Sequence, residues 1–535
     1  MLDHGSHTAY ALSMISSILR QALGDRVLAI TIISPTCDPR PLSQQFISTS
    51  KLKIQIGLIL DHRNAFRLVD HGPPASEEPS EEARAFRELW GDKSELRRFK
   101  DGRIIESVVW ELKNIDERAQ IPSEIVRYML SRHFGIDVEN DVRSFQSDFD
   151  RLLRISDSLV SHIVLPNAQP GFRNALTAFE NLVRHLKGLE DDIPLAILNV
   201  SPASCDLRYT STFTPIPYPL QNATSVASST RYLPAMDLVL QFERSVRWPD
   251  DLLAIQKMKL AFFEQLSEAL MKRIPDLWAN VVISPRNKYS DTLITESQAY
   301  LEIITPEGWA FAIRIWHDRE ATLLSRVLDT KRSLVAIKPQ HINHTSAIEV
   351  YRSYLVRYVH APRHHRAVAS LAHQFSAFSG TVRLVSRWLA SHWILPQISH
   401  ETIELICAFV FVGERQRQTV SDEHLLGVPT TKELGFFRVL AFLKNWSWES
   451  GLFVAVYDNE ADNGAGSTEN GNNQPNISFS GKGVWTISTS VDREGRVWTS
   501  DRPDALSARR IKMLASASID YVLEHEFNDF VPRVS

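Results

Sequence analysis

The chain has 535 residues, which is too long for one compact core and predicts two to four domains. Hydrophobic residues make up 44% of the chain and charged residues 23%, the composition of an ordinary soluble globular protein. The formal net charge of -4 argues against a protein that holds nucleic acid by bulk positive charge, although it allows a local basic patch.

The three cysteines, Cys37, Cys205 and Cys407, lie far apart in the sequence and form no C-x-x-C motif. This pattern predicts buried, reduced thiols in an intracellular protein, without a zinc site of the cysteine type. No apolar run reaches the roughly 20 residues that a membrane span needs. The first residues, MLDHGSHTAYALSM, lack the charged and apolar regions of a secretory signal.

The first region, residues 1–160, alternates helices and strands and is predicted to be a small α/β domain. A turn at Asp101-Gly102 leads into a strong strand over Ile104–Trp110, and the run HGPPASEEPSEE is predicted to be a loop. The other predicted elements are a helix over 8–23, strands over 26–33 and 51–60, helices over 82–90, 123–134 and 142–160, and a linker over 164–172.

The second region, residues 170–345, opens with a helix that carries one apolar stripe. It continues with the strand LAILNV, a Ser- and Pro-rich turn, the strand MDLVLQF, a helix over 252–271 and the strands QAYLEII and WAFAIRIW. The third region, residues 346–535, is predicted to be mainly helical, with a Gly- and Asn-rich loop over 459–476.

The order of elements in the second region is that of a nucleotidyltransferase palm. An active palm needs a Gly-Ser turn, so that the backbone can approach a triphosphate. Here the turn reads Ser201-Pro202-Ala203-Ser204, and Pro202 removes a backbone donor and stiffens the loop. The sequence therefore predicts that this turn cannot cradle a phosphate.

An active palm also needs the pattern Asp-x-Asp and a third acid on a later strand, because two metal ions need several shared oxygen ligands. In this chain Asp237 stands alone as a carboxylate predicted to be buried, and Ala235 occupies the place of its partner. The later strand offers Arg314 and no acid, and a positive charge opposes metal binding. The residues predict an inactive site with no catalytic residue, no metal and no cofactor.

The densest basic stretch is ELWGDKSELRRFKDG. Its basic residues are Lys93, Arg97, Arg98, Lys100 and Arg103, and the acids Asp92, Glu95 and Asp101 interleave with them. The interleaving favours an ion-paired structural corner, and a contact to RNA or to a protein is the alternative. The full phosphate-loop motif is absent.

Histidines gather in two places. His364, His365 and His373 share one segment, but no pair has the i, i+4 spacing of a helical zinc site. They predict an amphipathic helix surface. His341 and His344 lie in a loop-like stretch that carries no metal motif.

Several long segments resemble the Nrap family of nucleolar RNA-associated proteins. They are KIQIGLILDHRNAFRLVDHGP, FRELWGDKSELRRFKDGRIIESVVWE, IVRYMLSRHFGI, LRYTSTFTP, FERSVRWPDDLLAIQKMKLAF, FSGTVRLVSRWL and GRVWTSDRPDA. They follow one another in the family's order and cover essentially the whole chain. The family is built as two successive modules, each with a transferase head, a helical domain and a tail.

The resemblance implies an α/β (α+β) fold in three parts. Residues 1–160 correspond to a tail-like domain of the first module, and residues 170–345 to an inactive nucleotidyltransferase head. Residues 346–535 correspond to a helical domain like that of poly(A) polymerase and oligoadenylate synthetase. The chain therefore covers part of the family's architecture and is expected to be a fragment or a partial gene model.

The resemblance also implies a non-catalytic nucleolar role in the small-subunit processome and its UTP-C complex, in 18S ribosomal RNA maturation and 40S ribosome biogenesis. The implied partners are ribosomal RNA-processing protein 7, casein kinase 2, and pre-ribosomal RNA with the U3 small nucleolar ribonucleoprotein; no membrane is implied. Two alternatives stay open: an active template-independent RNA nucleotidyltransferase, and an interaction module that contacts proteins only.

Overall fold

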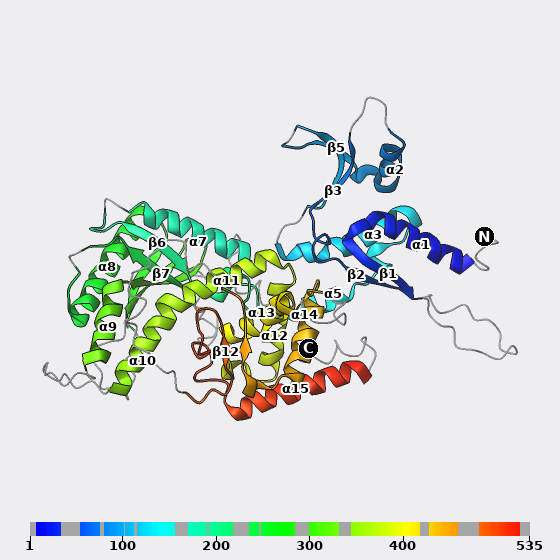
Figure 1. Ribbon diagram of the computed structural model, residues 1–535. Helices are drawn as coiled ribbons and strands as arrows, with labels where there is room; N and C mark the ends of the chain where they lie inside the picture. The colour runs from blue at the N-terminus through cyan, green and yellow to red at the C-terminus, as the bar shows by residue number, and fades with distance from the viewer. Residues whose placement is uncertain are drawn as a thin grey trace, which may run out of the picture. The chain divides into compact units, whose positions relative to one another are not determined.

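The computed structural model describes residues 7–33, 54–74, 80–100, 102–111, 115–155, 170–189, 192–217, 235–245, 248–283, 299–330, 344–417, 427–457 and 481–524. The chain divides into two compact units (Figure 1). Unit 1 holds residues 1–149 and 420–435, and unit 2 holds residues 150–419 and 436–535. In the described part of the chain, no helix has the length and apolar character needed to cross a membrane.

Unit 1 contains two small antiparallel sheets and several helices. Its elements are α1 (His7–Leu23), β1 (Val27–Ile33), β2 (Gln55–Leu60), β3 (Val69–Pro74), α2 (Glu81–Trp90), β4 (Glu95–Arg98), β5 (Ile104–Val109), α3 (Ile121–Phe134), α4 (Val138–Asp141) and the start of α5 (Phe145–Leu153). One sheet pairs β1 with β2, and the other has the order β3-β5-β4. The predicted strand after the Asp101-Gly102 turn is confirmed as β5.

The core of unit 1 includes one buried ion pair. Arg26 is fully buried, and its Nη2 lies 2.8 Å from Oδ2 of Asp70. The same carboxylate oxygen accepts a hydrogen bond from the indole Nε1 of Trp110 at 2.9 Å. Burial on its own would raise the pKa of Asp70, but Arg26 holds this pKa below its ordinary value. This pair joins the start of β1 to the other sheet.

Two strands of unit 1 differ from the sequence prediction. β3 extends to Pro74, into the run predicted to be a loop, and its register with β5 shifts between His71 and Pro74. Prolines fit there because β3 is an edge strand of its sheet. β4 was not predicted, because all four of its residues are exposed and its sequence shows no hydrophobic alternation.

The head of unit 2 is a five-stranded mixed sheet with helices packed against it. Its elements are α7 (Phe172–Lys187), β6 (Ile197–Pro202), β7 (Met236–Phe242), α8 (Leu252–Arg273), β8 (Trp278–Ile283), β9 (Ala299–Ile304), β10 (Ala310–Trp316) and α9 (Asp318–Thr330). The strand order is β6-β7-β10-β9-β8. β7 and β10 are parallel, and the other neighbours are antiparallel. The strand β8 was not predicted.

Alternation along β7 assigns its side chains to two faces of the sheet. Met236, Leu238, Leu240 and Phe242 enter the main core, together with residues of α7 and α8. Val239 points to the other face and joins a smaller cluster with residues of α9 and of α10 (His344–Leu355). Asp237 is two residues from Val239 on the same strand and therefore lies on this second face.

The helical domain completes unit 2. Its elements are α10 (His344–Leu355), α11 (Ala361–Gln374), α12 (Phe378–Ser391), α13 (His400–Arg417), α14 (Lys432–Asn445, whose residues up to Gly435 are assigned to unit 1), β11 (Leu452–Phe453), β12 (Ile487–Ser488) and α15 (Ala505–Glu524). A five-residue π-helix over Val356–His360 joins α10 to α11. The predicted α/β fold is confirmed, and so is the mainly helical third region. The loop predicted over 459–476 lies outside the described residues.

Candidate functional site

Asp237 lies near the start of β7, and Ala235 precedes the strand. The side chain of Asp237 is 56% exposed, so the prediction that it is buried is wrong. The alternation of the strand explains the error, because the apolar neighbours Met236 and Leu238 face the core and Asp237 faces away from it.

Arg314 contacts this carboxylate from the neighbouring strand. β10 runs parallel to β7, with Ala312 opposite Asp237 and Arg314 opposite Val239. Nε of Arg314 lies 3.4 Å from Oδ1 of Asp237, and the guanidinium lies 4.6 Å from the ring centroid of Tyr300. The arginine side chain is only 15% exposed, so the carboxylate has a fixed positive neighbour.

The nearest acid in the register of the sheet is Glu302 on β9, which lies opposite Ala312. It is two strands away from Asp237, or about 10 Å across the sheet. Carboxylates that share a metal ion must approach it to about 2.0–2.6 Å. Within the described ranges, no group of three or more His, Cys, Asp or Glu residues is arranged to hold a metal ion.

The turn predicted to lack a phosphate cradle has its polar groups engaged within the protein. Ser201 and Pro202 are the last residues of β6, and Pro202 lies opposite Leu238. The Ala203 N–H donates to the carbonyl of Asp237 at 3.0 Å. The hydroxyl of Ser204 accepts from the Asp206 N–H and caps the short helix over Cys205–Arg208.

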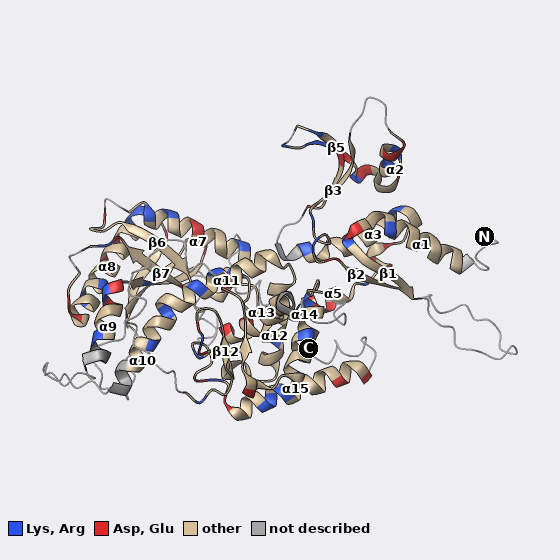
Figure 2. Ribbon diagram, in the orientation of Figure 1, with Lys and Arg blue, Asp and Glu red and all other residues tan. Residues whose placement is uncertain are grey.

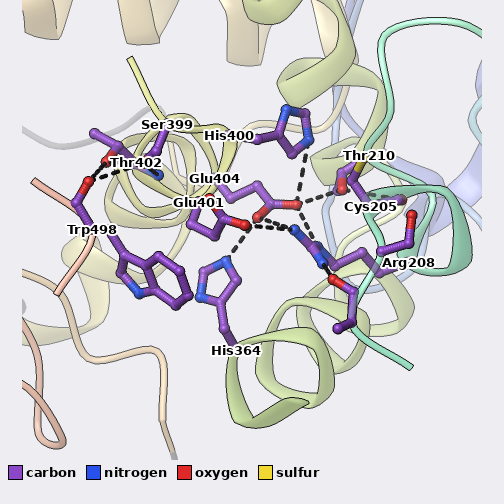
Figure 3. A network of polar contacts seen from close by, with 12 residues as sticks. Cys205, Arg208, Thr210, His364, Ser399, His400, Glu401, Thr402, Glu404 and Trp498 are labelled. Atoms are coloured by element: carbon purple, nitrogen blue, oxygen red, sulfur yellow. Dashed lines mark hydrogen bonds and ion pairs between the residues drawn. The ribbon is translucent and has the colours of Figure 1, made fainter. Parts of the chain in front are cut away.

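A buried polar network begins at the end of this turn (Figure 3). Arg208 and Glu404 are 196 residues apart in the sequence and both are essentially inaccessible to solvent. Arg208 donates to the two carboxylate oxygens of Glu404, from Nε at 2.6 Å and from Nη2 at 2.9 Å. Its Nη1 donates to the carbonyl of Ala203 at 2.7 Å. All three nitrogens of the guanidinium are therefore engaged within the protein.

Three further side chains surround Glu404. The hydroxyl of Thr210 donates to Oε1 at 2.5 Å, and Nε2 of His364 lies 2.7 Å from Oε2. Nε2 of His400, one turn earlier on α13, lies 3.6 Å from Oε1. Nδ1 of His364 lies 3.0 Å from the hydroxyl of Tyr457. The network joins the turn of the head to α11 and α13 of the helical domain, as Figure 3 shows.

The ionisation of this network follows from burial and charge. Burial on its own would raise the pKa of Glu404, but Arg208, His400 and His364 hold this pKa well below its ordinary value. Burial on its own would lower the pKa of Arg208, but Glu404 raises it above its ordinary value. Burial also lowers the pKa of the neighbouring His365 to about 3, and the charge of Arg208 adds to this effect.

The sequence analysis missed Arg208 and Glu404 and placed two histidines wrongly. His364 is fully buried and His365 is 8% exposed, so the predicted surface role is wrong for both, whereas His373 is exposed. The imidazole of His364 is buried because Glu404 and Tyr457 satisfy its ring nitrogens. A lone glutamate inside the apolar run TIELICAFVFV was the signal for a buried ion pair. His341 lies outside the described residues, and the side chain of His344 is not described.

A separate cleft of about 480 Å³ opens elsewhere on the head. Its lining includes Arg244, which follows β7, and His317, Arg319 and Arg326, which follow β10. It therefore lies after the carboxyl ends of the two parallel strands, whereas Asp237 lies near the amino end of β7. The cleft and the carboxylate of Asp237 therefore lie at opposite ends of β7.

The predicted basic stretch lies in unit 1 and divides into two parts. Nζ of Lys93 lies 3.9 Å from the ring centroid of Trp110, and burial lowers the pKa of this lysine. Arg97 and Arg98 lie exposed on β4, and Lys100 and Arg103 lie exposed in the turn to β5. Figure 2 shows these positive charges in the hairpin of β4 and β5.

One ion pair is described within this hairpin. Nη2 of Arg97 lies 3.0 Å from Oε2 of Glu95, and the two side chains are 44% and 59% exposed. An ion pair this exposed contributes about 0–1 kcal/mol to stability. This ion pair therefore contributes little to folding.

Sequence models of one family match three successive stretches of the chain. Nrap protein domain 3 matches residues 1–135, and the Nrap protein nucleotidyltransferase domain 4 matches residues 148–373. The Nrap protein PAP/OAS1-like domain 5 matches residues 375–532.

Curated relatives match over almost the whole chain. U3 small nucleolar RNA-associated protein 22 of Schizosaccharomyces pombe is 29% identical over 95% of this chain and 43% of that protein. Nucleolar protein 6 of Xenopus laevis is 26% identical over 98% of this chain and 43% of that protein. The chain thus spans about two fifths of the length of these relatives. Their names state a nucleolar or small-nucleolar-RNA association and no enzymatic activity.

Among solved structures, that of E. coli MS115-1 CdnC with ATP is 12% identical, with a TM-score of 0.36 over 72% of this chain and 95% of that chain. The fold class rests instead on the family models, which name a nucleotidyltransferase domain and a PAP/OAS1-like domain in the predicted order. The three successive matches and the relatives confirm the resemblance seen in the sequence: the chain belongs to the Nrap family.

Proposed function

We propose that this chain is a non-catalytic part of a nucleolar assembly factor that acts in 18S ribosomal RNA maturation within the small-subunit processome, and so in 40S ribosome biogenesis. The names of its relatives support a nucleolar role connected with U3 small nucleolar RNA. The three-part division at residues 1–160, 170–345 and 346–535 is part of this proposal.

The observation that carries the non-catalytic role is the contact between Asp237 and Arg314. Two-metal phosphoryl transfer needs several oxygen ligands around a pair of cations. This strand offers one carboxylate, and a guanidinium lies beside it at 3.4 Å. The arginine supplies a positive charge where a metal ion would have to sit, so the head is a pseudo-nucleotidyltransferase.

The ion pair of Arg208 and Glu404 supports the same conclusion. An arginine near the palm turn is a natural ligand for a phosphate, because its fork of donors fits two oxygens. In this chain the guanidinium is buried and all of its nitrogens donate to protein acceptors. Arg208 thus serves the junction between the head and the helical domain.

The proposal also names the partners of this assembly factor. They are pre-ribosomal RNA with the U3 small nucleolar ribonucleoprotein, ribosomal RNA-processing protein 7 and casein kinase 2. For RNA, the proposed contact is the basic hairpin, defined as Arg97, Arg98, Lys100 and Arg103. These four side chains are exposed, so phosphates of an RNA can reach them.

The double charge reversal Arg97→Glu/Arg98→Glu tests this contact. We expect the affinity for a single-stranded pre-ribosomal RNA fragment to fall at least about tenfold, because two phosphate contacts are lost. The slope of log affinity against log salt concentration should become shallower by about 1.4. Fluorescence anisotropy over a salt series, together with thermal melting, measures both binding and folding.

The matched control is Arg184→Glu/Lys187→Glu, which reverses two exposed charges on α7. The control should keep its RNA affinity within about twofold. If the hairpin variant instead melts earlier and binds normally, the basic stretch is a structural corner. If the unaltered chain crosslinks to protein partners and binds no RNA, it is a protein-only module.

A further inference from the structure

The end of α12 presents an exposed tryptophan on an unusual backbone. Trp393 has a φ of 60°, in the left-handed region that favours glycine. The Trp393 N–H donates to the carbonyl of Ala390 at 3.0 Å, and the Ile394 N–H donates to the carbonyl of Leu389 at 2.9 Å. These two bonds form a Schellman motif, in which Trp393 occupies the position that glycine usually takes.

The backbone geometry is explained by its neighbours, but the tryptophan side chain is not. Ile394 and Leu389 occupy the two positions that usually make a hydrophobic contact in this motif, and each is 2% exposed. Trp393 is 86% exposed, so its side chain gains almost nothing from folding. A left-handed conformation is strained for a residue with a Cβ. Glycine would suit this position better for stability alone.

The face of α15 beside Trp393 is also apolar and exposed. Leu506 is 76% exposed and Met513 is 71% exposed, seven residues apart on one stripe of the helix. Arg509 and Arg510 lie between them on the same stripe and are exposed. Figure 1 shows α15 at the edge of the helical domain.

Two hydrogen bonds hold the loop after α12 against α15 and the segment before it. Nη2 of Arg510 donates to the carbonyl of His392 at 3.1 Å, next to Trp393. Nη1 of Arg502 donates to the carbonyl of Pro396 at 2.9 Å. The surface is therefore pre-organised, which lowers the entropy that binding must overcome.

We propose that Trp393, Leu506, Met513, Arg502, Arg509 and Arg510 form a docking surface for an acidic, apolar segment of a partner protein. Exposed Trp and Arg are the residues most enriched in binding hot spots, and Met is enriched in interfaces. The two aliphatic side chains favour a protein over RNA, because bases stack on aromatic rings. This surface lies outside the palm and the basic hairpin, so the inference goes beyond the proposed function.

The charge balance of the surface selects an acidic partner. Two acids lie nearby, and both are engaged within the protein. Asp504 accepts from the Ser507 N–H at 2.8 Å, and Asp501 pairs with Arg352 at 3.0 Å. The three arginines exceed the two acids, and their side chains complement carboxylates on a partner.

The test places the photo-crosslinking residue p-benzoylphenylalanine at position 506 of the full chain. The chain is irradiated in extract of the organism that expresses it, and the crosslinked peptide is sequenced. We expect a protein segment that carries aliphatic or aromatic residues and a net negative charge. The variant Trp393→Gly should reduce its yield at least tenfold, and its melting temperature should stay unchanged or rise by roughly 2 °C. The control carries the crosslinker at position 198, where Leu198 is 59% exposed on β6.

Any of four results overturns the proposal. They are no protein crosslink from position 506, crosslinks to RNA or to a second copy of the chain, a basic or purely polar target segment, and the same segment captured from position 198. A fifth contrary result concerns Trp393→Gly. If this variant melts markedly earlier, or keeps the crosslink yield, the tryptophan serves the fold and not a partner.

Discussion

Glu404→Gln is expected to destabilise the folded chain by about 3–5 kcal/mol. The substitution keeps the size and shape of the side chain but leaves the guanidinium of Arg208 buried without its counter-charge. Three of the hydrogen bonds to Glu404, from Arg208 and Thr210, end on its carboxylate oxygens. Urea unfolding at pH 7 measures the loss as a shift of the midpoint.

Two further variants separate charge from packing. Arg208→Met/Glu404→Leu removes both buried charges together and should recover most of the loss, because a buried ion pair is often no more stable than an apolar replacement. Glu401→Gln is the matched control. Glu401 lies 3.9 Å from Arg208 and is 25% exposed, so its loss should stay below about 1 kcal/mol. Equal losses for the single and the double variant would contradict the charge argument.

The folded chain is expected to lose stability as the pH falls below about 6.5, which is well above the pH range in which carboxylates titrate. Burial lowers the pKa of His365 to about 3 and that of His317 to about 4, against about 6.5 in an unfolded chain. Both histidines are 8% exposed. The folded state keeps both imidazoles neutral. Between the folded and the unfolded pKa, the unfolded chain therefore binds more protons than the folded chain. Stability is full above pH 6.5 and falls as the pH drops toward 4.

The size of the acid effect follows from the two shifts. At pH 5 each histidine should remove about 2 kcal/mol, or about 4 kcal/mol together. His360, whose pKa burial also lowers to about 4, adds to the loss. Urea midpoints at pH 7.5 and pH 5.0 measure it. His365→Gln and His317→Gln should each reduce the pH dependence by about 2 kcal/mol, and His373→Gln, on the exposed side of α11, should leave it unchanged.

Local periodicity was sufficient to predict much of the head from the sequence. The helices α7 and α8 and the strands β7 and β10 each carry an apolar pattern longer than one turn or one alternation. The strands β4 and β8 were missed for the opposite reason. β4 is exposed throughout, and only one residue of β8 is buried, so neither strand shows a clear pattern.

The candidate site divides in the same way. The sequence shows directly that Ala235 stands where the motif has an acid and that the strand of Arg314 carries none, because each part of the palm motif is a short run of residues. The pair of Arg208 and Glu404 could not, because its two partners come from segments 196 residues apart. The exposure of Asp237 depends on which face of β7 meets the main core. The sequence conceals that choice, because the apolar Val239 lies on the same face as Asp237 and is buried in a second cluster.

The absence of catalysis is the central claim, and one measurement tests it most directly. The chain is incubated with a single-stranded RNA primer, each nucleoside triphosphate in turn, and magnesium or manganese, and primer extension is resolved to single nucleotides. We expect no incorporation above the level without protein, and the same result for Asp237→Ala. Incorporation by the unaltered chain that Asp237→Ala abolishes would contradict the account, because it would show that this one carboxylate, despite Arg314 at 3.4 Å, still supports metal-dependent transfer.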